Sequence, residues 1–173
     1  LDAGIFVVAA AGNAGPHNSD VSTPANVDRV ISVGAYDRFM TPWSNSSVGS
    51  QIDPYSETTR VWPNQKPEIL APGSYILSTV SSDKSPPYAY STGTSDATLF
   101  VTGSLALILQ DLSQRNVVNI SSLNDNRIDI VKQALAESAK PMGGQIGHDE
   151  RSGYGMLDAV EWRNRVESSA DQW

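Results

Sequence analysis

Residues 88–112 read YAYSTGTSDATLFVTGSLALILQDL, and this stretch decides the fold. Aromatic and small residues alternate up to Gly93-Thr94-Ser95, and apolar residues at helical spacing then continue to Leu112. The pattern predicts a strand, a sharp turn and a long buried helix over residues 96–112. Ser95 is therefore expected where the turn meets the helix.

A serine at such a junction has two interpretations. The first turn of a helix presents unpaired amide N–H groups and a partial positive charge, which can stabilise an oxyanion beside the hydroxyl of Ser95. Gly93 allows the close turn that this arrangement needs. The other interpretation is an ordinary core helix with Ser95 as its N-cap. The segment 93–98 alone leaves both open.

Asn13 provides a second signal. The apolar run Ile5–Ala11 predicts a buried strand of a parallel sheet, and Asn13 follows its carboxyl end. Ligands of open α/β sheets bind at that edge. The side-chain amide of Asn13 can donate to a developing oxyanion, although a turn asparagine is the commoner role in a Gly-Asn-Ala-Gly sequence.

The remaining elements predict an α/β fold with a mostly parallel sheet. Further strands are expected over residues 30–35, 68–71, 75–79 and 153–157. Helices are expected over residues 127–139 and 159–168, the second capped by Asp158. The strands cluster early and the helices late, an imbalance that fits part of a domain better than a whole one.

Composition excludes several classes of function. The 173 residues carry a net charge of −7, which disfavours nucleic acid and anionic lipid as partners. There is no cysteine, so disulfides, cysteine–zinc sites and thiol catalysis are excluded. The apolar runs are too short for a membrane span.

Several short motifs occur in a fixed order between Gly4 and about Val160. They are VAAAGNAG (8–15), STPA (22–25), VISVGA (30–35), WSN (43–45), APG (71–73), GTSDAT (93–98) and GYGMLDA (153–159). In identity and order they resemble the motifs of the subtilisin-like serine peptidases. The resemblance implies a three-layer α/β domain, a mostly parallel sheet flanked by helices. Residues 1–173 would form the C-terminal portion of that domain.

The resemblance also assigns roles. It implies that Ser95 is the nucleophile of a serine endopeptidase and that Asn13 is its side-chain oxyanion donor, with the backbone N–H of Ser95 as second donor. Ala11 and Gly12 would line the pocket for the residue before the scissile bond, and Thr94 would also contact substrate. The substrates would be peptides or proteins, and no cofactor is required.

The catalytic Asp and His of such enzymes precede the oxyanion asparagine, so both are expected outside this chain. His17 and His148 lie in polar loops and are predicted to be solvated. The fragment alone is therefore expected to be inactive, because a serine without a general base is a poor nucleophile. We also expect it to pair with its own N-terminal half or to self-associate through the edge of strand 5–11.

Two residues depart from the family pattern, which has Met at the position of Asp96 and Pro at that of Leu99. A carboxylate at Asp96 would oppose an oxyanion. It would alternatively stabilise a protonated histidine, or select basic residues beyond the scissile bond. A further alternative is a catalytically inactive homologue, a pseudopeptidase with a binding or regulatory role.

Expectations about metal binding and cellular location follow only from the resemblance. No side-chain metal site is predicted, but relatives often bind structural calcium through loop carbonyls, and residues 23–29 offer such carbonyls. The family favours a secreted or cell-envelope location.

Overall fold

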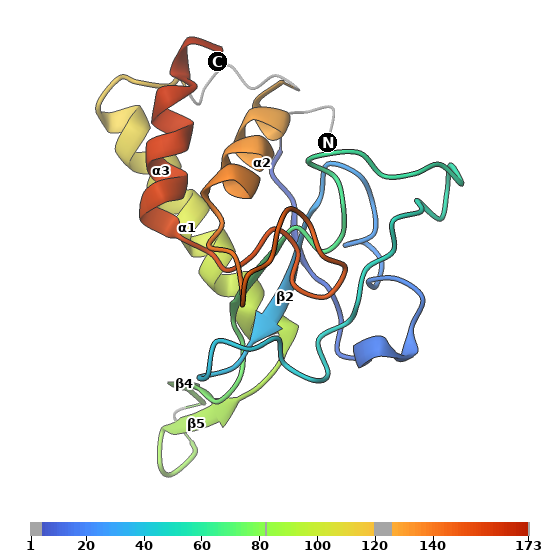
Figure 1. Ribbon diagram of the computed structural model, residues 1–173. Coiled ribbons are helices and arrows are strands. Elements are labelled where there is room, and N and C mark those ends of the chain that lie inside the picture. Colours follow the sequence, from blue (N-terminus) through green and yellow to red (C-terminus); the bar gives the residue numbers. More distant parts are fainter. Residues whose placement is uncertain (1–4, 82, 120–125, 173) are drawn as a thin grey trace.

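A three-stranded parallel sheet forms the centre of the computed structural model, which describes residues 5–81, 83–119 and 126–172. The strands β1 (Val8–Ala10), β2 (Ile31–Tyr36) and β3 (Ile69–Pro72) lie side by side in the order β1-β2-β3 (Figure 1). Val8 pairs with Ile31, and Val33 pairs with Ile69. Both faces of β2 are buried, as its continuous apolar sequence predicts.

The helices pack on one face of this sheet. They are α1 (Thr94–Gln114), α2 (Asn126–Ser138) and α3 (Ala159–Ser168), and their buried residues share one core cluster with Ile31, Val33 and Ile69. Trp162 of α3 is fully buried and donates from its indole N–H to the carbonyl of Val131, 3.0 Å away. The other face carries a smaller cluster made with loop residues.

An antiparallel hairpin leads into α1. Strand β4 (Ile76–Thr79) pairs with β5 (Tyr88–Ser91), and the hairpin extends away from the sheet at the lower end of Figure 1. One-turn 3-10 helices lie at Gly15–His17 (η1) and Ala170–Gln172 (η2). Asp158 caps α3 as predicted, accepting the amide of Glu161 at 3.0 Å.

Three predicted elements differ from those observed. The strand expected over residues 5–11 is regular only from Val8 to Ala10. The strand expected over residues 153–157 is wrong, because this segment makes only isolated bridges, such as Leu70 with Met156. Its glycines Gly153 and Gly155 have φ angles of 63° and 136°, which interrupt an extended strand.

Helix α1 is also less buried than its sequence predicts. Ala97, Val101 and Leu105 face the core, but Leu99 and Leu107 on the opposite side are 70% and 67% exposed. Apolar residues on both sides of a helix normally indicate packing on both sides. The α/β class is confirmed, and the exposed apolar side of α1 fits a partial domain.

In the described part of the chain, none of the helices is both long and apolar enough to cross a membrane.

Candidate active site

Ser95 lies in the first turn of α1, at the carboxyl edge of the sheet. The helix begins at Thr94 with Gly93 as N-cap, so Ser95 is inside the helix and does not cap it. The N-cap interpretation of Ser95 is therefore wrong. Its side chain is exposed and has no hydrogen-bond partner among the described residues. The hydroxyl is thus accessible beside the first helical turn, where the amide of Ser95 has no partner within the helix.

Asn13 follows β1 and reaches the same turn of α1. Its Oδ1 accepts two hydrogen bonds from Thr94, from the amide N at 3.0 Å and from Oγ1 at 2.9 Å. These bonds fix which way the amide group faces. Its donor atom Nδ2 is left on the side of Gly93.

Two N–H donors converge beside Gly93. A β-carbon placed on Gly93 would lie 3.4 Å from Nδ2 of Asn13 and 3.7 Å from the backbone N of Ser95. A side chain at this position would therefore fill the space between the two donors. Glycine leaves this space open, and the pair of donors next to a serine hydroxyl is the arrangement that stabilises an oxyanion.

Hydrogen bonds of Thr94 connect the start of α1 to the loop that follows β1. Its side chain is 1% exposed, and its Oγ1 accepts the amide of Gly12 at 3.1 Å while donating to Asn13. Gly12 has a φ of 108°, which favours glycine, and a β-carbon there would come within 2.3 Å of Oγ of Ser22. Ala11 is fully buried. Substrate contacts of Ala11, Gly12 and Thr94 remain predictions.

Asp96 places a carboxylate at the edge of this site. Its Oδ2 accepts a hydrogen bond from Oγ of Ser91 at 2.9 Å. The same oxygen would lie 3.6 Å from a β-carbon on Gly93, so it borders the space that the two donors share. A like charge at about 4 Å opposes a developing oxyanion by roughly 1 kcal/mol in water and about 4 kcal/mol near a protein surface.

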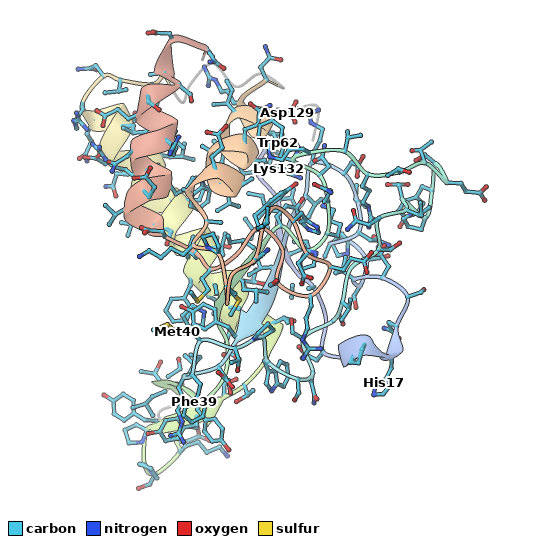
Figure 2. All side chains as sticks on the ribbon, viewed as in Figure 1. His17, Phe39, Met40, Trp62, Asp129 and Lys132 are labelled. Carbon is cyan, nitrogen blue, oxygen red and sulfur yellow. The ribbon has the colours of Figure 1, made fainter. Side chains whose placement is uncertain are left out.

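The two histidines differ in environment. His17 lies exposed on η1 and points away from the sheet (Figure 2), as predicted. The prediction that His148 is solvated is wrong. Its Nε2 lies 2.8 Å from the carbonyl of Pro67, and its ring packs edge-on against Tyr154. Burial lowers the pKa of His148, a shift that the Pro67 carbonyl and Glu68 partly oppose.

A buried charge cluster, which the sequence analysis missed, lies at the opposite edge of the sheet. Lys66, Glu68 and Lys132 are each at most 1% exposed. Oε1 of Glu68 accepts from Nζ of Lys66 at 2.8 Å and from Nζ of Lys132 at 2.6 Å. Both ammonium groups also donate to the carbonyl of Val30. The charged pair Lys66 and Glu68 directly before an apolar strand is the signal that could have revealed it.

The cluster predicts an unusual dependence of stability on pH. Burial lowers the pKa of Lys66 to about 8. Attraction to Glu68 opposes this shift, and repulsion from Lys132 adds to it. Between pH 8 and about 10 the unfolded chain therefore binds a proton that the folded chain has lost, so stability rises with pH. We expect the free energy of unfolding to increase by about 2 kcal/mol over this range. Urea unfolding at pH 7.5, 8.5 and 9.5 measures it.

Above pH 10 the trend should reverse, because burial raises the pKa of Tyr154 and its folded form resists ionisation. The variant Lys66→Met provides the control and should lose the rise between pH 8 and 10. An equal rise in this variant would assign the effect to other groups.

The loop at residues 23–29 has several of its carbonyls hydrogen-bonded within the protein, and calcium binding there remains a prediction. The guanidinium of Arg60, 3% exposed, donates to the carbonyl of Asn26 at 2.7 Å and to both carboxylate oxygens of Asp20 at 3.0 Å. The carbonyls of Pro24 and Val27 accept backbone amides. A buried guanidinium thus already binds one carbonyl of this loop, that of Asn26. Among the described residues, no three His, Asp or Glu side chains group closely enough to hold a metal.

Comparisons with known proteins agree with this architecture. The sequence matches the profile of the Subtilase family over residues 1–155. It is 34% identical over 138 residues to serine protease AprX of Bacillus subtilis (strain 168), covering 73% of this chain and 31% of AprX. It is 34% identical over 167 residues to an intracellular serine protease of Paenibacillus polymyxa, covering 94% of this chain and 43% of that protein.

Solved structures give the same result. The prenylagaramide maturation protease PagA superimposes with a TM-score of 0.69 at 28% identity, over 94% of this chain and 50% of PagA. The self-cleaved protease domain of PatA gives a TM-score of 0.67 at 28% identity, over 95% of this chain and 51% of that domain. The chain thus spans about half the length of these structures. Because the family profile covers residues 1–155, most of the chain, the chain belongs to the subtilase family.

Proposed function

We propose that the whole protein is a serine endopeptidase that hydrolyses peptide bonds through an acyl-enzyme at Ser95. One observation carries the proposal: Nδ2 of Asn13 and the backbone N of Ser95 both border the space that Gly93 leaves open beside the exposed hydroxyl. Two donors so placed would hold the oxyanion of the tetrahedral intermediate. Thr94 would act as a positioning residue, since it fixes the orientation of Asn13.

In the proposed reaction, Oγ of Ser95 forms a bond to the carbonyl carbon while its proton moves to a histidine. The peptide C–N bond then breaks, and the amine leaves with that proton. Water then attacks the acyl ester and gives a proton to the histidine; the bond between the acyl carbon and Oγ breaks, the carboxylic acid product leaves, and the histidine returns the proton to Ser95. The steps use side chains and water alone, so they need no cofactor.

The histidine and its aspartate partner would come from the rest of the protein. The chain covers 31% and 43% of two relatives that are named as serine proteases. Two features fit a neighbour: among the described strands β1 pairs only with β2, and the outer side of α1 exposes Leu107. We propose that the protein's own N-terminal half covers both, with self-association through β1 as the other occupant. A secreted or envelope location stays a prediction, because one relative is named as intracellular.

Asp96 favours a second candidate, an inactive homologue that binds peptides without cleaving them. Its Oδ2 borders the proposed oxyanion site and would oppose the charge that must form there. This candidate keeps the fold and the peptide-binding edge but has no turnover.

Comparing the 173-residue chain with the full-length protein tests the proposal. Full-length protein should hydrolyse a fluorogenic peptide and react covalently with a fluorophosphonate. The chain alone should show negligible turnover if, as we propose, the general base of Ser95 comes from the rest of the protein. Folded full-length protein that neither turns over peptide nor reacts would favour the inactive homologue. Inhibitor-sensitive turnover by the chain alone would place the base within residues 1–173.

A further inference from the structure

A chain of hydrogen bonds connects the side chain of His148 to that of Tyr154 through two glutamines. Nε2 of His148 lies 2.8 Å from the carbonyl oxygen of Pro67, which can only accept, so this nitrogen carries the proton. Nδ1 of the neutral ring is then an acceptor, and Nε2 of Gln51 donates to it at 3.3 Å. Nε2 of Gln65 donates to Oε1 of Gln51 at 3.3 Å, and the hydroxyl of Tyr154 donates to Oε1 of Gln65 at 2.8 Å. Along this chain each donor meets an acceptor, and the pattern requires a neutral His148.

Protonation of His148 would break this pattern at its Nδ1 atom. The added proton would point at Nε2 of Gln51, which is also a donor. Gln51 could offer its Oε1 only by turning its amide, and it would then present a donor to the amide group of Gln65. If Gln65 turned as well, the hydroxyl of Tyr154 would lose its acceptor. Because a buried donor without an acceptor costs free energy, a charged His148 disfavours this arrangement.

Burial and charge act in opposite directions on His148. The carboxylates that face it are those of Glu68, directly before β3, and of Asp149 and Glu150 beside it in the loop; Tyr154, whose ring packs against it, is the other titratable neighbour. Burial lowers the pKa of His148 by more than its carbonyl partner and these carboxylates raise it. Two buried lysines also offset the charge of Glu68. The folded chain therefore prefers the neutral ring, and this stabilisation declines as the pH falls from about 6.5 toward the lowered pKa.

Residues 141–155 form a loop whose two ends are fixed to each other. Lys140 and Met156, which flank the loop, exchange two backbone hydrogen bonds of 2.9 and 2.8 Å. Within the loop, Gly143, Gly144 and Gly147 have positive φ angles, and a β-carbon placed on any of them would meet nothing within 4 Å. A cavity of about 540 Å³ lies between this part of the loop and residues 40–42. The loop thus has room to move without disturbing its ends.

His148 and Glu150 hold the tip of this loop to the preceding loop of the chain. The carbonyl of Glu150 accepts the amide of Gly49 at 2.8 Å, and His148 makes the two contacts described above. The tip itself is a well-bonded turn, in which Oδ1 of Asp149 accepts two backbone amides at 2.9 Å and the hydroxyl of Ser152 at 2.8 Å. Burial raises the pKa of Asp149, but hydrogen bonds within the turn outweigh it and lower this pKa, so the turn persists in mild acid.

We propose that His148 is a pH-sensitive switch: the neutral ring holds the loop 141–155 against residues 51–67, and the protonated ring releases the tip of that loop. The turn then moves as a unit about the glycines of the loop, while the backbone pair at its two ends stays formed. Strand β3 keeps its backbone hydrogen bonds to residues 155–157, so the candidate active site beyond the other end of β3 is unaffected. The inference is therefore independent of the proposed peptidase function.

Hydrogen–deuterium exchange of full-length protein at pH 7.5 and 5.0, corrected for the intrinsic effect of pH on exchange, tests this switch. Peptides that cover Gly49 and residues 141–155 should lose about 10- to 100-fold in protection at pH 5.0, roughly the factor that a buried donor without an acceptor costs, while α2 stays protected. His148→Gln retains a donor for the carbonyl of Pro67 but cannot be charged, so it should keep its protection at both pH values. His17→Gln, which replaces the exposed histidine of η1, is the matched control and should respond as the wild type does.

Gln51→Glu tests the same switch in the opposite direction and keeps the test decisive if His148→Gln does not fold. Its carboxylate would accept a hydrogen bond from protonated Nδ1, so the loop should keep its protection at pH 5.0. Unchanged protection of the wild-type loop between the two pH values would overturn the proposal. A loss at pH 5.0 as large in His148→Gln or Gln51→Glu as in the wild type would also overturn it. So would a loss that extends equally to α2, because acid would then unfold the domain as a whole.

Discussion

Replacing Ser95 with alanine in the full-length protein should lower kcat by about 10⁶-fold, the loss that removal of the nucleophile causes in subtilisin. The hydroxyl is exposed in the first turn of α1, and it has no structural partner in the described chain that its loss would disturb. The free energy of unfolding should therefore stay within about 0.5 kcal/mol of that of the wild type, as for other surface substitutions. Hydrolysis of a fluorogenic peptide and urea unfolding of the same preparation measure both.

The variant Asn13→Ala separates the contribution of the oxyanion donor to kcat from that of the nucleophile. Asn13→Ala should retain Ser95 and its reaction with a fluorophosphonate, but it should lose about 10²–10³ in kcat, the usual effect of removing one such donor. Ser95→Ala protein with residual activity above 1% of wild type would contradict the assignment of the nucleophile. Full activity in Asn13→Ala would remove this residue from the site.

Replacing Glu68 with glutamine should destabilise the chain by about 3–5 kcal/mol at pH 7, because it leaves the ammonium groups of Lys66 and Lys132 buried without an opposing charge. Domains of this size are stable by about 5–15 kcal/mol, so partial unfolding at 37 °C is expected. Glutamine preserves shape and one acceptor, which isolates the effect of charge. Urea unfolding followed by circular dichroism measures the loss.

Two variants keep this prediction falsifiable if the glutamine variant is too unstable to purify. Lys66→Met leaves Lys132 and Glu68 as a neutral pair and should lose less than about 2 kcal/mol. Glu161→Gln breaks an exposed pair with Arg165 and should change stability by about 0.5 kcal/mol. A Lys66→Met variant that is less stable than Glu68→Gln would show that the cluster does not depend on Glu68 for its balance.

The Lys66–Glu68–Lys132 cluster and the candidate active site lie at opposite ends of β3. Glu68 precedes β3, while Gly73 follows it and accepts the amide of Gly93 at 2.8 Å. The strand thus carries the charge cluster at one end and the turn before Ser95 at the other. Moderate destabilisation of the cluster should therefore lower the population of folded protein, and the kcat proposed for folded molecules should stay unchanged.

Short-range patterns predicted most of the architecture. The apolar strands β2 and β3 and the helices α2 and α3 appear within a residue or so of their predicted bounds, because period and capping are local properties. Residues 153–157 were mistaken for a strand, since their apolar and aromatic content resembles one. Their positive φ angles come from glycines whose backbone packs against Glu68 and Lys140, and such contacts are set by distant segments.

The sequence by itself determined the family motifs and the identities of Ser95, Asn13 and Asp96, because motif order and residue type are properties of the chain alone. Only the tertiary structure decided what these residues do to one another. Segments about 80 positions apart meet through Thr94, which turns the amide of Asn13 toward Gly93. Likewise, two lysines share one carboxylate only because the fold brings Lys132 of α2 to Glu68, directly before β3. Hydrogen-bond direction and burial depend on contacts across the fold, and these are absent from local sequence.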